Sequence, residues 1–203
     1  MAGAVLMRRL IRGAVATTGF ALAFAPHAAL AHVEGSALSG GFLAGFAHPL
    51  GGLDHVVAMI AVGLWGAFLG PPAIWVLPVV FPVVMALGGA LGVAGIAIPS
   101  VEIGIALSAV VLGLMVVGAV RPPLWIAAAI VGAFAIFHGH AHGTELPTTA
   151  NALAYSGGFV VATGLLHLAG IALSQLKRWA IGEWVVRAGG AAIAATGVMF
   201  LLR

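Results

Sequence analysis

Two short stretches, far apart in the sequence, carry histidine and carboxylate side chains. Residues 48–55 read HPLGGLDH, and residues 137–145 read FHGHAHGTE. Imidazole together with carboxylate suits borderline divalent cations such as Ni²⁺, Co²⁺ or Zn²⁺, whereas Mg²⁺ and Ca²⁺ prefer shells made only of oxygen. The side-chain types therefore indicate a site for a transition-metal dication.

The spacing in the second stretch favours a helix that presents ligands on one side. His138 and His142 are four residues apart and Glu145 follows three later, so all three share one stripe of a helix. His140 lies about 200° around the helix from His138, on another face. In the first stretch, the adjacent side chains of Asp54 and His55 diverge unless a helix begins there.

The composition excludes a water-facing globule around these residues. Of 203 residues, 63% are hydrophobic and only 6% are charged, against about a quarter charged in an ordinary soluble domain. A soluble enzyme and a nucleic-acid binder are therefore excluded. The 30 glycines indicate closely packed membrane helices, and the absence of cysteine removes disulfides, thiolate metal sites and cysteine nucleophiles.

The hydrophobic pattern predicts an all-α, polytopic membrane helix bundle. Turn-forming prolines and polar residues divide it into six spans, at residues 36–69, 72–95, 101–120, 123–142, 150–173 and 184–202. The first span is too long for one straight crossing. We expect it to break at His48-Pro49, with a half-helix over residues 36–47 and a main helix from about Asp54.

The beginning of the chain resembles an export signal. Arg8, Arg9 and Arg12 precede a short apolar stretch, and Ala29-Leu30-Ala31 offers small residues for cleavage. We expect residues 1–31 to be a signal peptide and residues 32–203 to form a single six-helix transmembrane domain. The alternative is an uncleaved signal anchor. Without the first segment, the formal charge of +3 falls to zero, so charge indicates no anionic partner.

The loop charges predict the orientation. With the mature N-terminus in the periplasm, Arg121, Lys177 and Arg178 fall on the inner side, as the positive-inside rule expects. The chain is then a multi-pass protein of the bacterial inner membrane.

This topology brings both histidine stretches toward the outer face. Ionisable groups are costly in a bilayer, at about 2.5–3.5 kcal/mol each on insertion scales, so their convergence favours a function. The structural alternatives are that Asp54 caps a helix and that His55 is a packed, hydrogen-bonded side chain.

Four further residues are weaker candidates for metal ligands. His32 would become the new N-terminal residue, offering both amine and imidazole. Glu102 opens the third span, and its alternative is an interfacial position. His140 and His167 complete the set; His167 would be an exit-side ligand or a packed histidine.

The two stretches resemble the paired motifs of the HupE/UreJ family of membrane metal permeases. Residues 48–55 match H-P-x-x-G-x-D-H, and residues 137–145 match F-H-G-x-A-H-G-x-E, where His140 occupies an open position. The resemblance covers essentially the whole mature chain. It implies uptake of nickel, and sometimes cobalt, for metalloenzymes such as hydrogenase and urease. It also implies that six residues serve metal passage: His48, Asp54, His55, His138, His142 and Glu145.

The expected function is therefore a permease for Ni²⁺, with Co²⁺ as an alternative cargo. No organic cofactor, nucleic acid or catalytic reaction is expected, and no P-loop pattern indicates ATP coupling within the chain. The expected partners are the divalent ion and the lipid bilayer, and a homo-oligomer is compatible with the sequence. Two alternatives stay open: a non-transporting metal-binding accessory or sensor, and a membrane metalloenzyme with histidine boxes.

Overall fold

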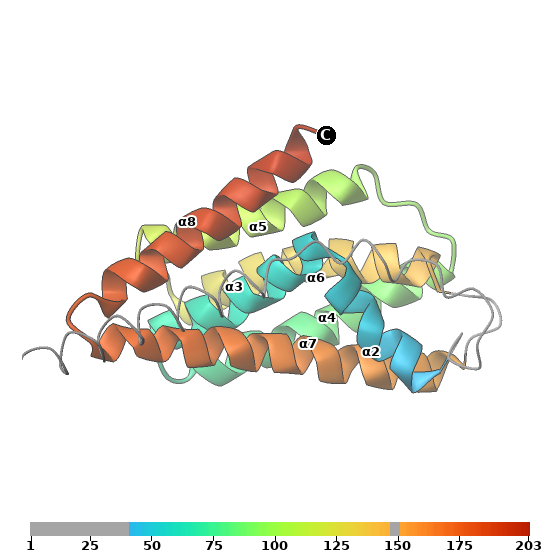
Figure 1. The fold of residues 1–203 in the computed structure, drawn as a ribbon. Coiled ribbons are helices and arrows are strands. Elements are labelled where there is room, and N and C mark those ends of the chain that lie inside the picture. Colours follow the sequence, from blue (N-terminus) through green and yellow to red (C-terminus); the bar gives the residue numbers. More distant parts are fainter. Residues whose placement is uncertain (1–40, 147–150) are drawn as a thin grey trace, which may run out of the picture. The chain divides into compact units, whose positions relative to one another are not determined.

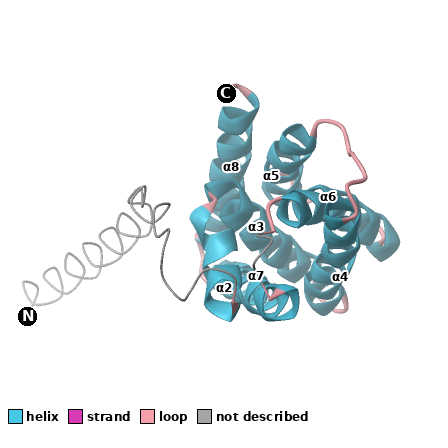
Figure 2. Cartoon of the chain, turned by 90° about the vertical axis from the view of Figure 1, so that its right-hand side faces the viewer, coloured by secondary structure: helices cyan, strands magenta, loops and turns pink. Residues whose placement is uncertain are grey.

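The computed structural model describes residues 41–146 and 151–203, and every regular element within them is a helix (Figures 1 and 2). The expected all-α class is confirmed. The proposed signal peptide and His32 lie outside the described residues. The elements are α2 (Phe42–Gly51), α3 (Leu53–Leu69), α4 (Ala73–Val93), α5 (Val101–Val117), α6 (Leu124–Thr144), α7 (Ala152–Ser174), the 3₁₀ turn η1 (Gln175–Arg178) and α8 (Gly182–Leu201).

The lengths of the helices identify a multi-pass membrane protein. Among the described residues, α4, α6, α7 with η1, and α8 are long and apolar enough to cross a bilayer. The pair α2 and α3 counts as a fifth span, although the two helices meet at 88°. α5 has 17 residues, or about 26 Å at 1.5 Å per residue, which is short of a hydrocarbon core of about 30 Å. The described residues therefore contain four or five candidate spans, and the count of six stays a prediction.

The expected break at His48-Pro49 is wrong by a few residues. Pro49 lies inside α2, and the chain turns at Gly52, which has the extended angles φ −101° and ψ 115°. Pro49 removes one hydrogen bond from the last turns of a ten-residue helix. Glycine loses more conformational freedom in a helix than any other residue does. The helix therefore ends at the two consecutive glycines, Gly51 and Gly52.

The helices pack in preferred pairs. α4 packs mainly on α6, α5 on α8, and α7 on both α2 and α3. Figure 1 shows α8 and α5 side by side, with α2 crossing α7, and Figure 2 shows the same pairs seen from one end. Residues from α2, α3, α5 and α6 can therefore meet in the space that these pairs enclose.

Glycines allow the backbones of α4 and α6 to touch. A Cβ atom at Gly139 would overlap the carbonyl group of Met85, and one at Gly143 would overlap that of Gly89. From the other side, a Cβ atom at Gly88 would meet the backbone of Ile136. Small residues permit such contacts between membrane helices. This contact fixes the position of α6, the helix that carries three of the histidines.

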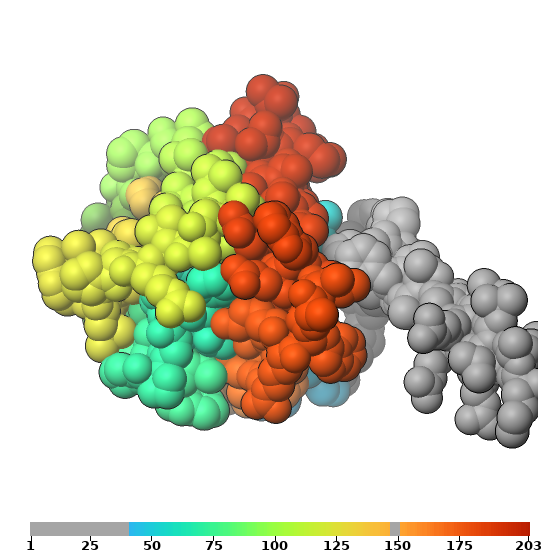
Figure 3. All heavy atoms as spheres, turned by 90° about the vertical axis from the view of Figure 1, so that its left-hand side faces the viewer, coloured from blue at the N-terminus to red at the C-terminus, as the bar shows by residue number. Residues whose placement is uncertain are grey.

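The loop cations gather at one end of the described bundle. Figure 3 faces this end, where the links that follow α3 (teal), α5 (yellow) and α7 (orange) lie together. The Arg121 guanidinium lies 5.2 Å from the centroid of the Phe68 ring, and the Lys177 amine lies 4.4 Å from it. Because α6 runs away from this end, its C-terminal histidines lie near the opposite one.

Replacing Gly139 with alanine should separate α4 from α6. The new methyl group has no space beside Met85, and overpacking of this kind costs about 1–3 kcal/mol. Thermal unfolding of the purified protein in detergent would measure the loss. The matched control is Gly164→Ala in α7, where a Cβ atom has no neighbour within 4 Å. Equal stability of the two variants would contradict the close α4–α6 contact.

Candidate metal centre

Asp54 and His55 meet because α3 begins beside them. The helix starts at Leu53, so Asp54 lies in its first turn. One carboxylate oxygen of Asp54 accepts hydrogen bonds from both the backbone nitrogen and the Nδ1 atom of His55, each at 2.9 Å. The N-cap residue is Gly52, which supplies no side-chain cap. Asp54 therefore orients an imidazole ring, as carboxylates do beside metal-binding histidines.

His48 and Glu145 join α2 to the end of α6. Their Nε2 and Oε2 atoms are 3.3 Å apart. Together with His142, these residues can offer one ligand atom each, all within 4.8 Å of one another. The side chain of Glu145 is 56% exposed and that of His48 is 31% exposed, so this group lies at the open side of the site.

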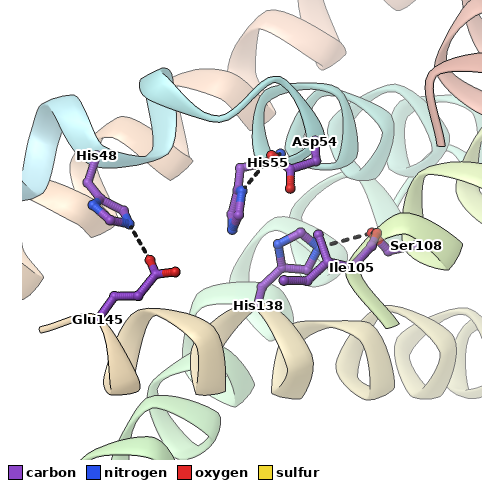
Figure 4. A network of polar contacts seen from close by, with 7 residues as sticks. All are labelled: His48, Asp54, His55, Ile105, Ser108, His138 and Glu145. Atoms are coloured by element: carbon purple, nitrogen blue, oxygen red, sulfur yellow. Dashed lines mark hydrogen bonds and ion pairs between the residues drawn. The ribbon is translucent and has the colours of Figure 1, made fainter. Parts of the chain in front are cut away.

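Four imidazole rings form a row that leads inward. The ring centroids of His48 and His142 are 4.8 Å apart, those of His142 and His55 are 4.6 Å apart, and those of His55 and His138 are 4.9 Å apart. Figure 4 shows His48, His55 and His138 between α2, α3 and α6. His48 is the most exposed ring of the row, and His138 is fully buried. The row and its two carboxylates are called the histidine cluster below: His48, Asp54, His55, His138, His142 and Glu145.

Ser108 of α5 determines which nitrogen of His138 is free. The Ser108 hydroxyl donates to the carbonyl oxygen of Ile105 at 2.6 Å, and its oxygen lies 2.9 Å from Nε2 of His138 (Figure 4). A hydroxyl has one proton; with that proton on the Ile105 carbonyl, the Nε2–H of His138 donates to the Ser108 oxygen. The lone pair of His138 is then on Nδ1, which is buried and has no hydrogen-bond partner among the described residues.

The other rings also present unpartnered nitrogens. Because Nδ1 of His55 donates to Asp54, its lone pair lies on Nε2, which has no partner in the described part of the chain. Neither nitrogen of His142 has a partner there, and its ring is tilted at 60° to that of Phe159, with centroids 4.3 Å apart. Leaving a buried acceptor unsatisfied costs about 1–3 kcal/mol. Several such nitrogens lie beside two carboxylates. Their lone pairs and the carboxylate oxygens can together bind a cation.

The structure brings the six main candidates together and leaves the weaker ones apart. His140 points elsewhere, because its Nε2 lies 2.7 Å from the Ile96 carbonyl oxygen in the link after α4. Glu102 is exposed in the first turn of α5, and no hydrogen bond or ion pair joins it to the cluster within the described residues. His167 is buried in α7, beyond Phe81. His32 lies outside the described residues.

Ser108 and the aromatic residues around the row were not among the residues predicted from the sequence. Ser108 is the one hydroxyl residue of the span at 101–120, and a polar residue in the middle of an apolar span is the signal that could have identified it. Tyr155 and Phe159 of α7 lie near His48, with centroid separations of 5.8 and 6.3 Å. Aromatic residues are common in apolar helices, so no sequence signal distinguished these two.

Comparisons with known proteins agree on the affiliation of the chain. The family model described as HupE / UreJ protein matches residues 20–200. Protein HupE of Rhizobium leguminosarum bv. viciae is 48% identical over 188 residues, which cover 93% of this chain and 97% of that protein. No solved structure gives a significant match.

The family match therefore spans both histidine stretches and all the described helices except the last residue of α8. The similarity to a HupE protein extends over nearly the full length of both chains. The chain belongs to the HupE/UreJ family.

Proposed function

We propose that this chain is a permease that carries a divalent transition metal, Ni²⁺ with Co²⁺ as the alternative, from the periplasm across the inner membrane. The family resemblance supports nickel or cobalt as the cargo, for delivery to a metalloenzyme such as hydrogenase or urease. The apolar helices support a membrane location. Transport rather than catalysis is the role that we assign to the histidine cluster.

The row of unpartnered imidazole nitrogens carries this proposal. The free Nε2 of His55 and the free Nδ1 of His138 belong to rings whose centroids are 4.9 Å apart, and His142 stands beside them. A cation bound by one pair of rings is thus close to the next pair. Such a series suits conduction, because several moderate sites hold an ion without trapping it.

The carboxylates supply the charge that a dehydrated dication needs. Glu145 stands at the exposed side beside His48, and Asp54 stands behind His55. With neutral imidazoles, the two carboxylates carry a formal charge of −2, which balances one dication. An arriving cation replaces the contact between His48 and Glu145 and takes both as ligands.

The membrane potential is the proposed driving force. An inward dication gains about 4.6 kcal/mol per 100 mV, twice the value for a single charge. The histidine cluster and the loop cations Arg121 and Lys177 belong to opposite ends of the described bundle, and positive loops favour the cytoplasm. We therefore assign the exposed side of the cluster to the periplasm.

Replacing His138 with alanine should reduce nickel uptake at least tenfold, because the most deeply buried ring of the row is lost. The assay is Ni²⁺ uptake into liposomes that contain only the purified chain, with an inside-negative potential. The matched control is His140→Gln on the same helix, which keeps a donor for the Ile96 carbonyl and should retain uptake.

The same assay separates the permease from the accessory or sensor. A wild-type chain that binds Ni²⁺ but does not move it into liposomes would favour the non-transporting role. Uptake at the wild-type rate in the His138→Ala protein would contradict the assignment of the row.

Replacing Ser108 with alanine should weaken nickel binding while leaving the maximal uptake rate nearly unchanged. Ser108 does not touch the cation in this proposal; it positions His138 by accepting its Nε2–H. Loss of such a partner typically costs 10–100-fold in metal affinity. The concentration dependence of uptake would show a raised KM.

A second serine provides the control for this variant. Ser174 is buried and donates to the carbonyl of Ile171 at 2.6 Å, as Ser108 does to Ile105, but within the described residues no hydrogen bond joins it to a histidine. Ser174→Ala should leave KM unchanged. A similar KM in both variants would show that Ser108 does not orient His138.

A further inference from the structure

His167 is a buried imidazole that the histidine cluster does not include. It lies in α7 with 1% of its surface exposed. Neither ring nitrogen has a hydrogen-bond partner among the described residues. Burying a polar atom without a hydrogen-bond partner costs free energy, and an apolar side chain of similar size would avoid that cost. The imidazole therefore needs a reason other than packing.

Two more polar groups stand beside the His167 ring. Thr163 lies one helical turn earlier on the same side of α7, and its buried hydroxyl has no partner in the described part of the chain. The carbonyl group of Pro78 in α4 lies near the ring, without the geometry of a hydrogen bond. Pro82 has no N–H with which to bond that carbonyl within α4.

The Phe81 ring stands between His167 and the histidine cluster. Its centroid is 5.5 Å from that of His138 and 5.4 Å from that of His167, and the side chain is fully buried. His138 lies about 9 Å along α6 from its last residue, whereas His167 lies about 22 Å along α7 from its first. Since α6 and α7 are joined at that end, His167 is the deeper group.

We propose that His167, Thr163 and the Pro78 carbonyl form a second cation subsite, deeper than the histidine cluster and divided from it by the Phe81 ring. This inference rests on the proposed function and adds a second stage to it. The subsite offers one imidazole nitrogen and neutral oxygens but no carboxylate. It holds a dication less tightly than the outer cluster does, which favours release toward the inner side. The face of the Phe81 ring attracts a cation that passes between the two.

The absence of native cysteine makes this subsite directly testable. His167→Cys places the only thiol of the full chain at the subsite, where it should capture the soft ion Cd²⁺. In proteoliposomes, Cd²⁺ should inhibit Ni²⁺ uptake by this variant at a concentration at least tenfold lower than for the wild type. A thiol chelator should reverse the inhibition.

Ala162→Cys is the matched control, because Ala162 is equally buried in α7 but lies about 140° around the helix from His167. It should respond to Cd²⁺ as the wild type does. Equal Cd²⁺ sensitivity of the two cysteine variants would overturn the subsite.

Equilibrium dialysis separates failure of the subsite from failure of the proposed function. The purified His167→Cys protein should bind one Cd²⁺ more than the Ala162→Cys protein, whether or not the wild type transports nickel. Extra binding without any wild-type uptake supports the subsite and contradicts the permease. Equal binding by both variants contradicts the subsite alone.

A second variant covers the case in which the cysteine protein does not fold. His167→Gln should lower Ni²⁺ uptake at least tenfold while Ni²⁺ binding at the histidine cluster and the Tm stay at their wild-type values. Wild-type uptake by a folded His167→Gln protein would contradict the subsite.

Discussion

An imidazole nitrogen buried among apolar helices must find a hydrogen-bond partner or a cation, and this constraint governs the centre of the molecule. Water cannot solvate such a group inside the bundle, and each lost partner costs about 1–3 kcal/mol. Asp54 satisfies one nitrogen of His55, and Ser108 satisfies one nitrogen of His138. The remaining nitrogens belong to rings whose centroids lie 4.6–4.9 Å from the next ring of the row. The arrangement is therefore costly without a cation and favourable with one.

Close backbone contact makes this arrangement possible. Glycines at the α4–α6 contact remove the side chains that would hold the helices apart, and Gly45 of α2 packs on the backbone of Tyr155 in the same way. The rings of His48 and His142 can then approach one another from different helices. Glycines at these contacts thus serve the histidine cluster indirectly, by deciding how near the helices lie.

Much of the fold and of the candidate site could be predicted from the sequence, and the remainder depended on contacts between helices. The spacing of His138 and His142, and the separate direction of His140, follow from helical geometry alone. The meeting of Asp54 with His55 depended on where α3 begins, which the sequence left open. The break in the first span was misplaced because Pro49 proved tolerable near the end of a helix, whereas Gly52 did not. Ser108 was missed because its role exists only when α5 lies against α6.

The seam between α4 and α6 has a consequence for leakage. Where Gly139 and Gly143 touch the backbone of the other helix, neither water nor an acyl chain fits between the two. Along this line of contact, passage beside the imidazole row is closed by backbone rather than by side chains that can swing aside.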